Sequence, residues 1–411
     1  MHRRFPALAL VAALAACAPA PPDDTASIPL PGGPGAEYYQ RWPHGPNPTG
    51  DPFVFPVTVW MQDPVSLDTG TPDGRAYRDI GVPATLGLWD DERWHERQAG
   101  LYATGWKAYV SAGKVDAVLA DPGRAAHYLG YLVADEPDMQ KSAGHRYHPE
   151  LQPSAVLRRA DEVRAQDPTR PTFVNFGMWM GTPDGRHDYA YVEETYEQDM
   201  RTYCQAADIA SADFYGWTHP DPDKVGAFRY GQVVDTMRKW CGTGKPVYGF
   251  VETGHPYEGG GLITADQVES AVWNAIVHGA DGINYFAHSF YPEGDDDFVS
   301  ALTRPEIAAR LKDVNARLQR LAPVLNAGGG AAFTMRGDGD VPITVRLEKG
   351  HVLAQADGTP ARPDSGRTRA AIPVPVTEGT AEVVDENRTV PITGGRIVDD
   401  FAPYGFHVYR Y

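Results

Sequence analysis

The sequence has 411 residues, of which 54 are Asp or Glu and 37 are Lys or Arg, giving a formal net charge of −17. This acidic excess argues against a nucleic-acid partner, because phosphates need basic surfaces. It suits a neutral or cationic substrate, although surface solubility alone explains it equally well. The length exceeds one ordinary domain and leaves room for a large domain with a small companion.

The start of the chain predicts an export signal. A basic stretch over residues 2–4 precedes an apolar run over residues 5–16 that is too short to span a bilayer. The run ends in Leu-Ala-Ala followed by Cys17, which resembles a bacterial lipobox, where the cysteine becomes lipidated. We expect residues 1–17 to be a lipoprotein signal peptide; the alternative is an ordinary secretory peptide with a chance cysteine. Both place the mature protein outside the cytoplasm, and lipidation would hold it in the cell envelope or at the cell surface.

Residues 18–50 are rich in Pro, Gly, Asp and Ser and lack apolar periodicity. Such a composition cannot bury enough surface to fold alone, and it predicts a flexible tether. Beyond this segment no apolar run is long enough for a transmembrane helix. A lipid on Cys17 is therefore the only membrane attachment that we expect.

From residue 51 to residue 326 short apolar runs alternate with longer amphipathic stretches, the pattern of βα units. Eight runs are apolar enough to be buried on both faces, as parallel strands are. Eight strands alternating with helices over this length predict a closed (β/α)₈ barrel, with an open doubly wound sheet as the alternative. The expected strands are Phe53–Trp60, Ala84–Leu88, Lys107–Val110, Leu129–Ala134, Thr172–Phe176, Ile209–Phe214, Val247–Val251 and Gly282–Phe286, and the clearest helices are Pro153–Gln166, Val225–Trp240, Thr264–His278 and Arg304–Leu321.

Residues 327–411 have a different pattern, because helical periodicity stops after the Gly-rich stretch that follows Asn326. Short apolar runs separated by Gly, Asp and Asn turns predict a small antiparallel β domain of sandwich type. The expected strands are Phe333–Met335, Ile343–Glu348, His351–Ala356, Ala381–Val384, Thr389–Ile392 and His407–Tyr411.

Two of the predicted barrel strands end in a glutamate. The fourth leads into Asp135-Glu136-Pro137, and the seventh ends in Glu252. Active sites of such barrels lie at the carboxyl ends of the strands, so both side chains are expected at one mouth. A glycosidase needs such a pair, one carboxylic acid to protonate the leaving oxygen and one carboxylate to attack or to activate water. The alternative is that each glutamate caps the next helix or pairs with a basic residue.

The arrangement resembles the large clan of retaining glycoside hydrolases with (β/α)₈ barrels, which includes β-galactosidases, cellulases and β-1,3-glucanases. The resemblance implies cleavage of β-linked glycosidic bonds with retention, Glu136 as general acid/base and Glu252 as nucleophile. Many clan members have Asn before the acid/base, whereas this chain has Asp135, a carboxylate that should raise the pKa of Glu136. More narrowly, the stretches Val57–Gln62 and Ala322–Asn326 resemble uncharacterised secreted glycosidases.

Further substrate-binding residues are expected where aromatic or polar side chains fall at or just past the strand ends. Aromatic planes pack on the C–H faces of sugars, and polar side chains bind the hydroxyls. The alternatives are packing in the barrel core for the aromatic rings and structural hydrogen bonding for the polar groups. The candidates are Trp60, Trp89, Asp135, Asn175, Trp179, Tyr215, Trp217, Phe286 and His288.

Cys204 and Cys241 are the only cysteines after Cys17. Each lies shortly before a predicted strand, the sixth and the seventh, so the pair is expected on adjacent connections at the amino-terminal face of the barrel. An oxidising compartment then favours a disulfide, with two buried thiols as the alternative. We expect no metal and no cofactor, because the sequence lacks spaced calcium or zinc ligands and a phosphate-binding loop.

The sequence therefore predicts a secreted glycoside hydrolase acting on an oligo- or polysaccharide. Two alternatives stay open: a surface carbohydrate-binding lipoprotein on an inactive barrel, and an inverting hydrolase or lyase on the same scaffold.

Overall fold

The structure, a computed structural model, describes residues 30–66, 73–139, 149–182, 193–292 and 296–411. Cys17, the predicted signal peptide and the first part of the predicted tether lie outside these residues. No helix within the described residues is both long enough and apolar enough to cross a membrane.

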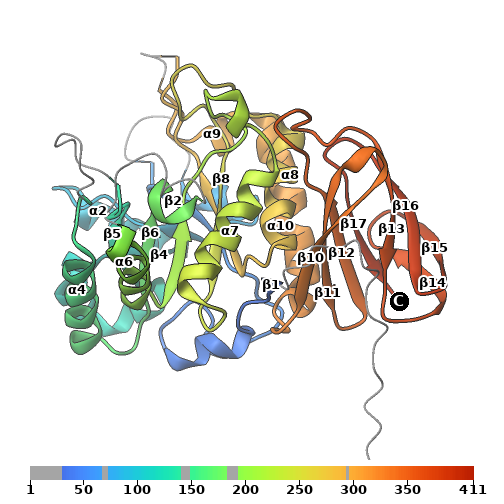
Figure 1. Ribbon diagram of the computed structural model, residues 1–411. Coiled ribbons are helices and arrows are strands. Elements are labelled where there is room, and N and C mark those ends of the chain that lie inside the picture. The colour runs from blue at the N-terminus through green and yellow to red at the C-terminus, as the bar shows by residue number, and fades with distance from the viewer. Residues whose placement is uncertain (1–29, 67–72, 140–148, 183–192, 293–295) are drawn as a thin grey trace, which may run out of the picture.

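Eight parallel strands close into a barrel, which confirms the predicted fold (Figure 1). Each strand pairs with the next along the chain, and the last pairs with the first through Val57 and Ile283. The strands are almost wholly buried because side chains fill the barrel interior and helices cover its outside. Their bounds are β2 Val57–Trp60, β3 Ala84–Leu86, β4 Lys107–Ser111, β5 Tyr128–Asp135, β6 Thr172–Phe176, β7 Ile209–Ala212, β8 Val247–Glu252 and β9 Gly282–Phe286.

Helices surround the barrel, and the sequence signals for their ends are confirmed where they were clearest. The Thr264 hydroxyl accepts a hydrogen bond from the Gln267 amide, and the Gln267 side-chain oxygen accepts one from the Thr264 amide, a capping box that starts α8. Pro153 lies in the first turn of α4, where a missing N–H is tolerated. The helices are α1 Gly74–Asp79, α2 Trp94–Thr104, α3 Val115–Leu119, α4 Pro153–Gln166, α5 Met178–Gly181, α6 Glu193–Ala206, α7 Phe228–Cys241, α8 Ala265–Val277, α9 Ser300–Thr303 and α10 Pro305–Leu325.

The rest of the chain builds the predicted antiparallel β domain, with its own apolar core. Its sheet has the strand order β1-β10-β11-β12-β17-β14-β15-β16-β13. Three of its strands, β1, β13 and β16, were not predicted. The bounds are β1 Leu30–Pro31, β10 Ala331–Arg336, β11 Pro342–Glu348, β12 His351–Ala356, β13 Thr368–Pro373, β14 Glu378–Val383, β15 Arg388–Thr393, β16 Arg396–Phe401 and β17 Phe406–Arg410.

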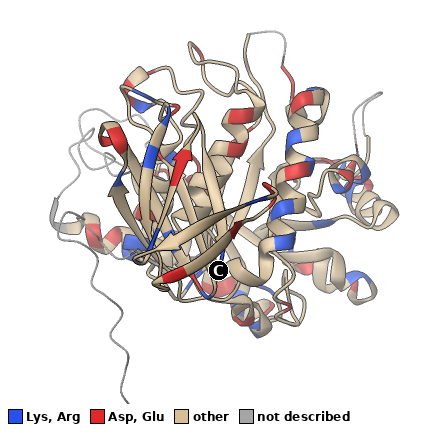
Figure 2. Ribbon diagram, turned by 90° about the vertical axis from the view of Figure 1, so that its right-hand side faces the viewer, with Lys and Arg blue, Asp and Glu red and all other residues tan. Residues whose placement is uncertain are grey.

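α8 and α10 carry the contact between the barrel and the β domain. Trp273 on α8 stacks on Phe406 of β17, with ring centroids 4.4 Å apart. The buried Arg346 side chain of β11 donates to the main-chain oxygens of Ile276 and Leu325, at the ends of α8 and α10. Buried contacts of this kind fix one relative placement of the two domains. Acidic and basic residues are interspersed over both domains (Figure 2).

The N-terminal segment differs from the predicted tether, because residues 30–50 pack against the molecule. β1 pairs with β10, and the 3₁₀ helix Ala36–Arg41 lies beneath the barrel (Figure 1). Tyr38 donates to the main-chain oxygen of Asp208, just before β7, and Tyr39 bonds to the Tyr248 hydroxyl inside the barrel. Buried aromatic side chains thus compensate for a composition that otherwise favours disorder.

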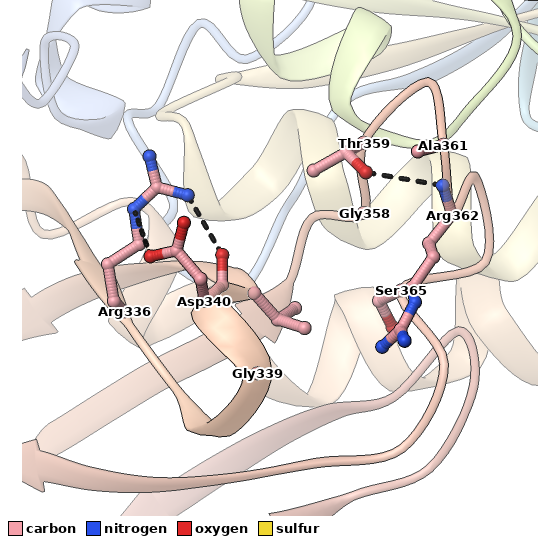
Figure 3. A pocket seen from close by; sticks show the side chains of 9 residues that line it. Arg336, Gly339, Asp340, Gly358, Thr359, Ala361, Arg362 and Ser365 are labelled. Carbon is pink, nitrogen blue, oxygen red and sulfur yellow. Dashed lines mark hydrogen bonds and ion pairs between the residues drawn. The ribbon is translucent and has the colours of Figure 1, made fainter.

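The β domain contains a cavity of about 310 Å³ (Figure 3). The turn at Asp338–Asp340 and the segment after β12 form its walls, and Arg336 and Arg362 line it. Arg336 is held by the main-chain oxygen of Asp340, and the Arg362 amide donates to the Thr359 hydroxyl. None of the predicted site residues lines this cavity.

Candidate active site

Glu136 directly follows β5, at the carboxyl end of the barrel. Its backbone has a φ of 41°, and its amide donates a 2.8 Å hydrogen bond to the main-chain oxygen of Asn175 on β6. A glutamate in this left-handed region is strained by about 1 kcal/mol or more, so the surroundings must hold it there. The neighbouring strand thereby fixes the direction in which the carboxyl group leaves the barrel.

Asn175 connects the acidic residues of the mouth. Its Nδ2 atom donates to Oδ1 of Asp135 at 3.0 Å and to Oδ1 of Asp213 at 3.2 Å, and its Oδ1 accepts from the Ser211 hydroxyl. The sequence predicted Asn175 as a partner for sugar hydroxyls. The structure instead engages both ends of this buried amide within the protein, so Asn175 positions the carboxylates.

Asp213, just after β7, is the third acidic residue here, beside Asp135 and Glu136. Its carboxyl group hydrogen-bonds to that of Glu136 and accepts a 3.0 Å hydrogen bond from the Tyr215 hydroxyl. Burial and the charge of Asp135 raise the pKa of Glu136 to about 7. Burial and the Glu136 carboxylate raise the pKa of Asp213 well above its usual range. The predicted effect of Asp135 on Glu136 is confirmed, and the larger cause is burial.

Glu252, the last residue of β8, has a different environment. It is 0% exposed, and its Oε1 atom accepts from the amides of Trp217 and Thr218 and from the Thr218 hydroxyl, at 3.1–3.2 Å. Its Oε2 atom accepts a 2.7 Å hydrogen bond from Tyr230 on α7. Burial raises the pKa of Glu252 to about 7, against these donors, which lower it. The carboxyl group thus ties the end of β8 to the segment after β7.

Tyr257, in the loop after β8, lies within range of the charges of Asp213, Glu252 and Glu136. Besides burial, the charges of Asp213, Glu252 and Glu136 each raise the pKa of its phenol. Its ring lies 5.5 Å from that of Tyr215. Glu136 and Glu252 therefore share one mouth, as predicted from their positions at the strand ends.

The predicted aromatic residues fall into two groups. Trp60, Trp179 and Trp217 are buried, so we assign them to packing; Trp60 lies against Phe250, and Trp217 against Tyr404 of the β domain. Tyr215 and Phe286 stack on each other at 4.7 Å, also buried.

Trp89 forms an open part of the rim and lies on the buried His288. Trp89 is 42% exposed and stacks on His288 with ring centroids 6.2 Å apart. Phe290 and the 47%-exposed Phe298, which were not predicted, pack against the same imidazole. Burial lowers the pKa of His288 to about 4, so its ring is neutral at pH 7. Its Nε2 atom has no hydrogen-bond partner within the described residues.

Three contributors to the mouth were missed from the sequence: Asp213, Tyr230 and Tyr257. Asp213 carried the same signal as the glutamates, an acidic residue at the end of a predicted strand. Tyr230 and Tyr257 lie in a helix and a loop, where no pattern marks them. No group of three or more His, Cys, Asp or Glu in the described parts of the chain is placed to hold a metal ion.

The disulfide between Cys204 and Cys241 is confirmed, with Cα atoms 5.1 Å apart. The cysteines lie in the last turns of α6 and α7, next to the connections where they were predicted. Lys245 donates from Nζ to the main-chain oxygens of Cys204 and Ala207 beside the bridge. This is the barrel end opposite the carboxyl cluster, which consists of Asp135, Glu136, Asp213 and Glu252.

No family model matches the chain, and no curated protein matches it in sequence. Solved structures do resemble it. A variant of AmyP in complex with maltotriose gives a TM-score of 0.50 at 9% identity, covering 87% of this chain and 97% of that one. The α-amylase of Lactobacillus plantarum gives 0.48 at 10% identity, over 88% and 99% of the two chains. The cold-adapted β-galactosidase of Rahnella sp. R3 gives 0.46 at 12% identity, over 69% and 58%. The likeness to the AmyP variant establishes the fold, a (β/α)₈ barrel followed by a β domain.

Proposed function

We propose that the protein is a glycoside hydrolase whose active site is the carboxyl cluster at the barrel mouth, with Glu136 as the general acid. The observation that carries this proposal is the environment of Glu136. Its partly exposed carboxyl group keeps a proton near neutral pH, because its pKa is raised to about 7. A carboxylic acid of this kind can protonate a glycosidic oxygen as the bond to the sugar breaks.

The rim supports an oligo- or polysaccharide substrate. Trp89 and Phe298 offer exposed rings on which sugar C–H faces can pack, and the buried His288 lies between them, with an Nε2 atom that has no partner among the described residues. The AmyP structures hold maltotriose and maltose, ligands of the same chemical class.

From the resemblance to the clan of retaining glycoside hydrolases we further propose that the protein cleaves β-linked bonds with retention and that Glu252 is the nucleophile. A nucleophile needs a lone pair that faces the anomeric carbon. Because Glu252 is fully buried and accepts four hydrogen bonds, this assignment requires the segment at Trp217 and Thr218 to release one oxygen when substrate binds. Retention corresponds to a carboxyl separation of about 5–5.5 Å, and inversion to about 6.5–9.5 Å.

The test compares Glu136→Gln and Glu252→Gln with the wild type on natural glycans and on aryl glycosides. Loss of the acid should reduce natural-substrate turnover by more than about 100-fold and spare aryl glycosides, whose leaving groups need less protonation. Loss of the nucleophile should abolish both, and azide should restore turnover of an aryl glycoside by Glu252→Ala. Glu258→Gln, an exposed glutamate of the same mouth loop, is the matched control.

NMR of the first-formed anomer separates retention from inversion. Wild-type protein that binds oligosaccharides but releases no product from any glycan would instead identify a carbohydrate-binding protein on an inactive barrel. If Glu136→Gln kept more than about a tenth of the activity on natural glycans, the assignment of the acid would be withdrawn.

A further inference from the structure

We infer that Asp213 is a positioning residue that shares a proton with Glu136 and, once that proton is spent, makes the glutamate basic enough to regain one from water in each catalytic cycle. The inference rests on the proposed function and assigns a role that the two-glutamate scheme does not contain.

The position of Asp213 is fixed from three sides. Its amide donates to the main-chain oxygen of Phe176 at 3.0 Å, its Oδ1 atom accepts from Asn175, and its Oδ2 atom accepts from Tyr215. The remaining contact of its carboxyl group is the hydrogen bond to Glu136. Asp213 cannot turn away from Glu136 without giving up the hydrogen bonds from Asn175 and Tyr215.

Among the described residues, the groups that act on the pair are acidic or neutral. Asp135, Asp138 and Glu150 act on Glu136, and the phenols of Tyr215 and Tyr257 face the cluster. Within the described residues neither carboxyl group forms an ion pair with a lysine, arginine or histidine. Two hydrogen-bonded carboxyl groups without a cation cannot both ionise easily, so they hold one proton between them. The raised pKa values of both groups agree with this arrangement.

Asp213 and Asp135 differ in whether they hydrogen-bond to Glu136. Asp135 is exposed and acts on Glu136 through its charge, whereas Asp213 is partly buried and hydrogen-bonds to the reacting carboxyl group. Only the hydrogen-bonded neighbour can share the proton of Glu136 directly.

The proton balance of the cycle follows from this contact. Glu136 gives its proton to the glycosidic oxygen while the bond from that oxygen to the anomeric carbon breaks. Both carboxylates are then ionised, and the Asp213 charge makes Glu136 more basic. Glu136 next takes a proton from the water that attacks the anomeric carbon, and the shared proton is restored. Asp213 thus assists both the acid step and the base step.

Asp213→Asn is the direct test, because the amide keeps the shape and removes the charge. The alkaline limb of the pH profile of kcat/KM should shift to lower pH by at least about one pH unit, toward the ordinary pKa of a glutamate. Asp135→Asn, which removes a charge without a hydrogen bond to Glu136, should move the limb less. Tyr215→Phe should move it up, because Asp213 loses a donor that favours its ionised form.

An infrared titration of the carboxyl C=O band in the free protein gives a readout that does not need activity. The part of the band that is absent from Glu136→Gln should titrate near pH 7 in the wild type and shift to lower pH in Asp213→Asn. The part that remains in Glu136→Gln belongs to other buried carboxyl groups, among them Glu252, whose pKa is also raised to about 7. The inference would be overturned by a folded Asp213→Asn variant that loses activity while its infrared band and the alkaline limb of its kcat/KM profile stay at the wild-type pH. Asp213 would then have a structural role only. A shared-proton band in a protein that hydrolyses no glycan would contradict the proposed function alone. If Asp213→Asn does not fold, Tyr215→Phe provides the test. A shift of its alkaline kcat/KM limb to higher pH supports the inference, and an unchanged limb rejects it.

Discussion

Tyr230 on α7 donates a 2.7 Å hydrogen bond to Oε2 of Glu252, so a residue of the outer helix layer holds the carboxyl group at the end of β8. The same hydroxyl accepts from the Trp217 amide. One phenol therefore joins α7, β8 and the segment after β7. Burial raises the pKa of Glu252 from 4.5 to about 7, so the folded state favours the protonated form, stability falls as the pH rises from about 4.5 to about 7, and the full cost of the buried charge is present above pH 7.

Tyr230→Phe should destabilise the protein by about 1–3 kcal/mol, and more at pH 8 than at pH 5. At pH 5 Glu252 is protonated in the folded state and depends less on the donor. At pH 8 it is ionised, and the lost hydrogen bond leaves a buried charge with one donor fewer. Urea unfolding at both pH values measures the difference. Equal losses would mean that Tyr230 contributes packing only.

His278 should make the domain interface sensitive to alkaline pH. Its Nδ1 atom lies 2.8 Å from Asp235 on α7, and its Nε2 atom lies 3.8 Å from Asp357 of the β domain. Burial lowers its pKa, but the two carboxylates outweigh burial and raise it to about 10. Because the folded pKa lies above the unfolded value, this stabilisation is complete below about pH 6.5 and is lost between pH 6.5 and 10.

His278→Gln should lower the free energy of unfolding at pH 6 by about 3 kcal/mol or more, because two carboxylates lose their cation. The variant should also lose less stability than the wild type between pH 7 and pH 10. Chemical unfolding across that range measures both effects. An unchanged slope would show that His278 is neutral in the folded protein.

The Cys204–Cys241 disulfide should stabilise the fold without taking part in catalysis. Closing a loop of this length contributes on the order of 3–4 kcal/mol, chiefly through the unfolded state. Reduction, or the double change to serine, should lower Tm and leave kcat/KM at moderate temperature within about twofold, because the bridge lies at the end opposite the mouth. Loss of activity in a protein that is still folded would contradict this placement.

Trp89→Ala should weaken the binding of long substrates. The exposed ring stacks on His288 and offers a flat surface at the rim, and stacking of this kind is worth about 0.5–1.5 kcal/mol. KM should rise severalfold for oligosaccharides and change little for a monosaccharide aryl glycoside. Phe53→Ala is the matched control, because Phe53 is 67% exposed but precedes β2 at the opposite end of the barrel. Equal effects in the two variants would argue against a sugar-binding rim.

We further propose that Cys17 carries a lipid, as its lipobox-like surroundings suggest. Cys17→Ser should release the protein from membranes or block its processing. Mass spectrometry of the mature N terminus is decisive, since cleavage elsewhere with an unmodified Cys17 contradicts the anchor.

The barrel was predictable because each parallel strand is a continuous apolar run, and its expected positions match β2–β9 closely. The strands β13 and β16 escaped prediction because Arg369, Asp399 and Asp400 interrupt their apolar residues. The segment at 30–50 escaped because local composition does not reveal a distant surface that buries Tyr38 and Tyr39.

The sequence could predict which residues lie at the mouth only where their position at a strand end determines it. Strand ends indicated Glu136 and Glu252, but their environments depend on neighbours far along the chain. Tyr230 comes from a helix, and the partner of Glu136 is Asp213, from a strand two places along the barrel. The same dependence buried Trp179 and Trp217, which the sequence placed at the rim.

The pairing of β1 with β10 bears on the order in which the chain folds. Leu30 pairs with Ala332, and the Gly32 amide donates to the Gly330 oxygen at 2.7 Å, so this early segment needs a partner that is synthesised much later. Contacts of such sequence separation form slowly, because a very long loop must close first. Residues 30–32 are thus made early and are among the last to be fixed. Until β10 is in place, the end of the barrel where Tyr39 meets Tyr248 stays open to water, so a chain cut short before residue 331 should expose apolar surface and aggregate.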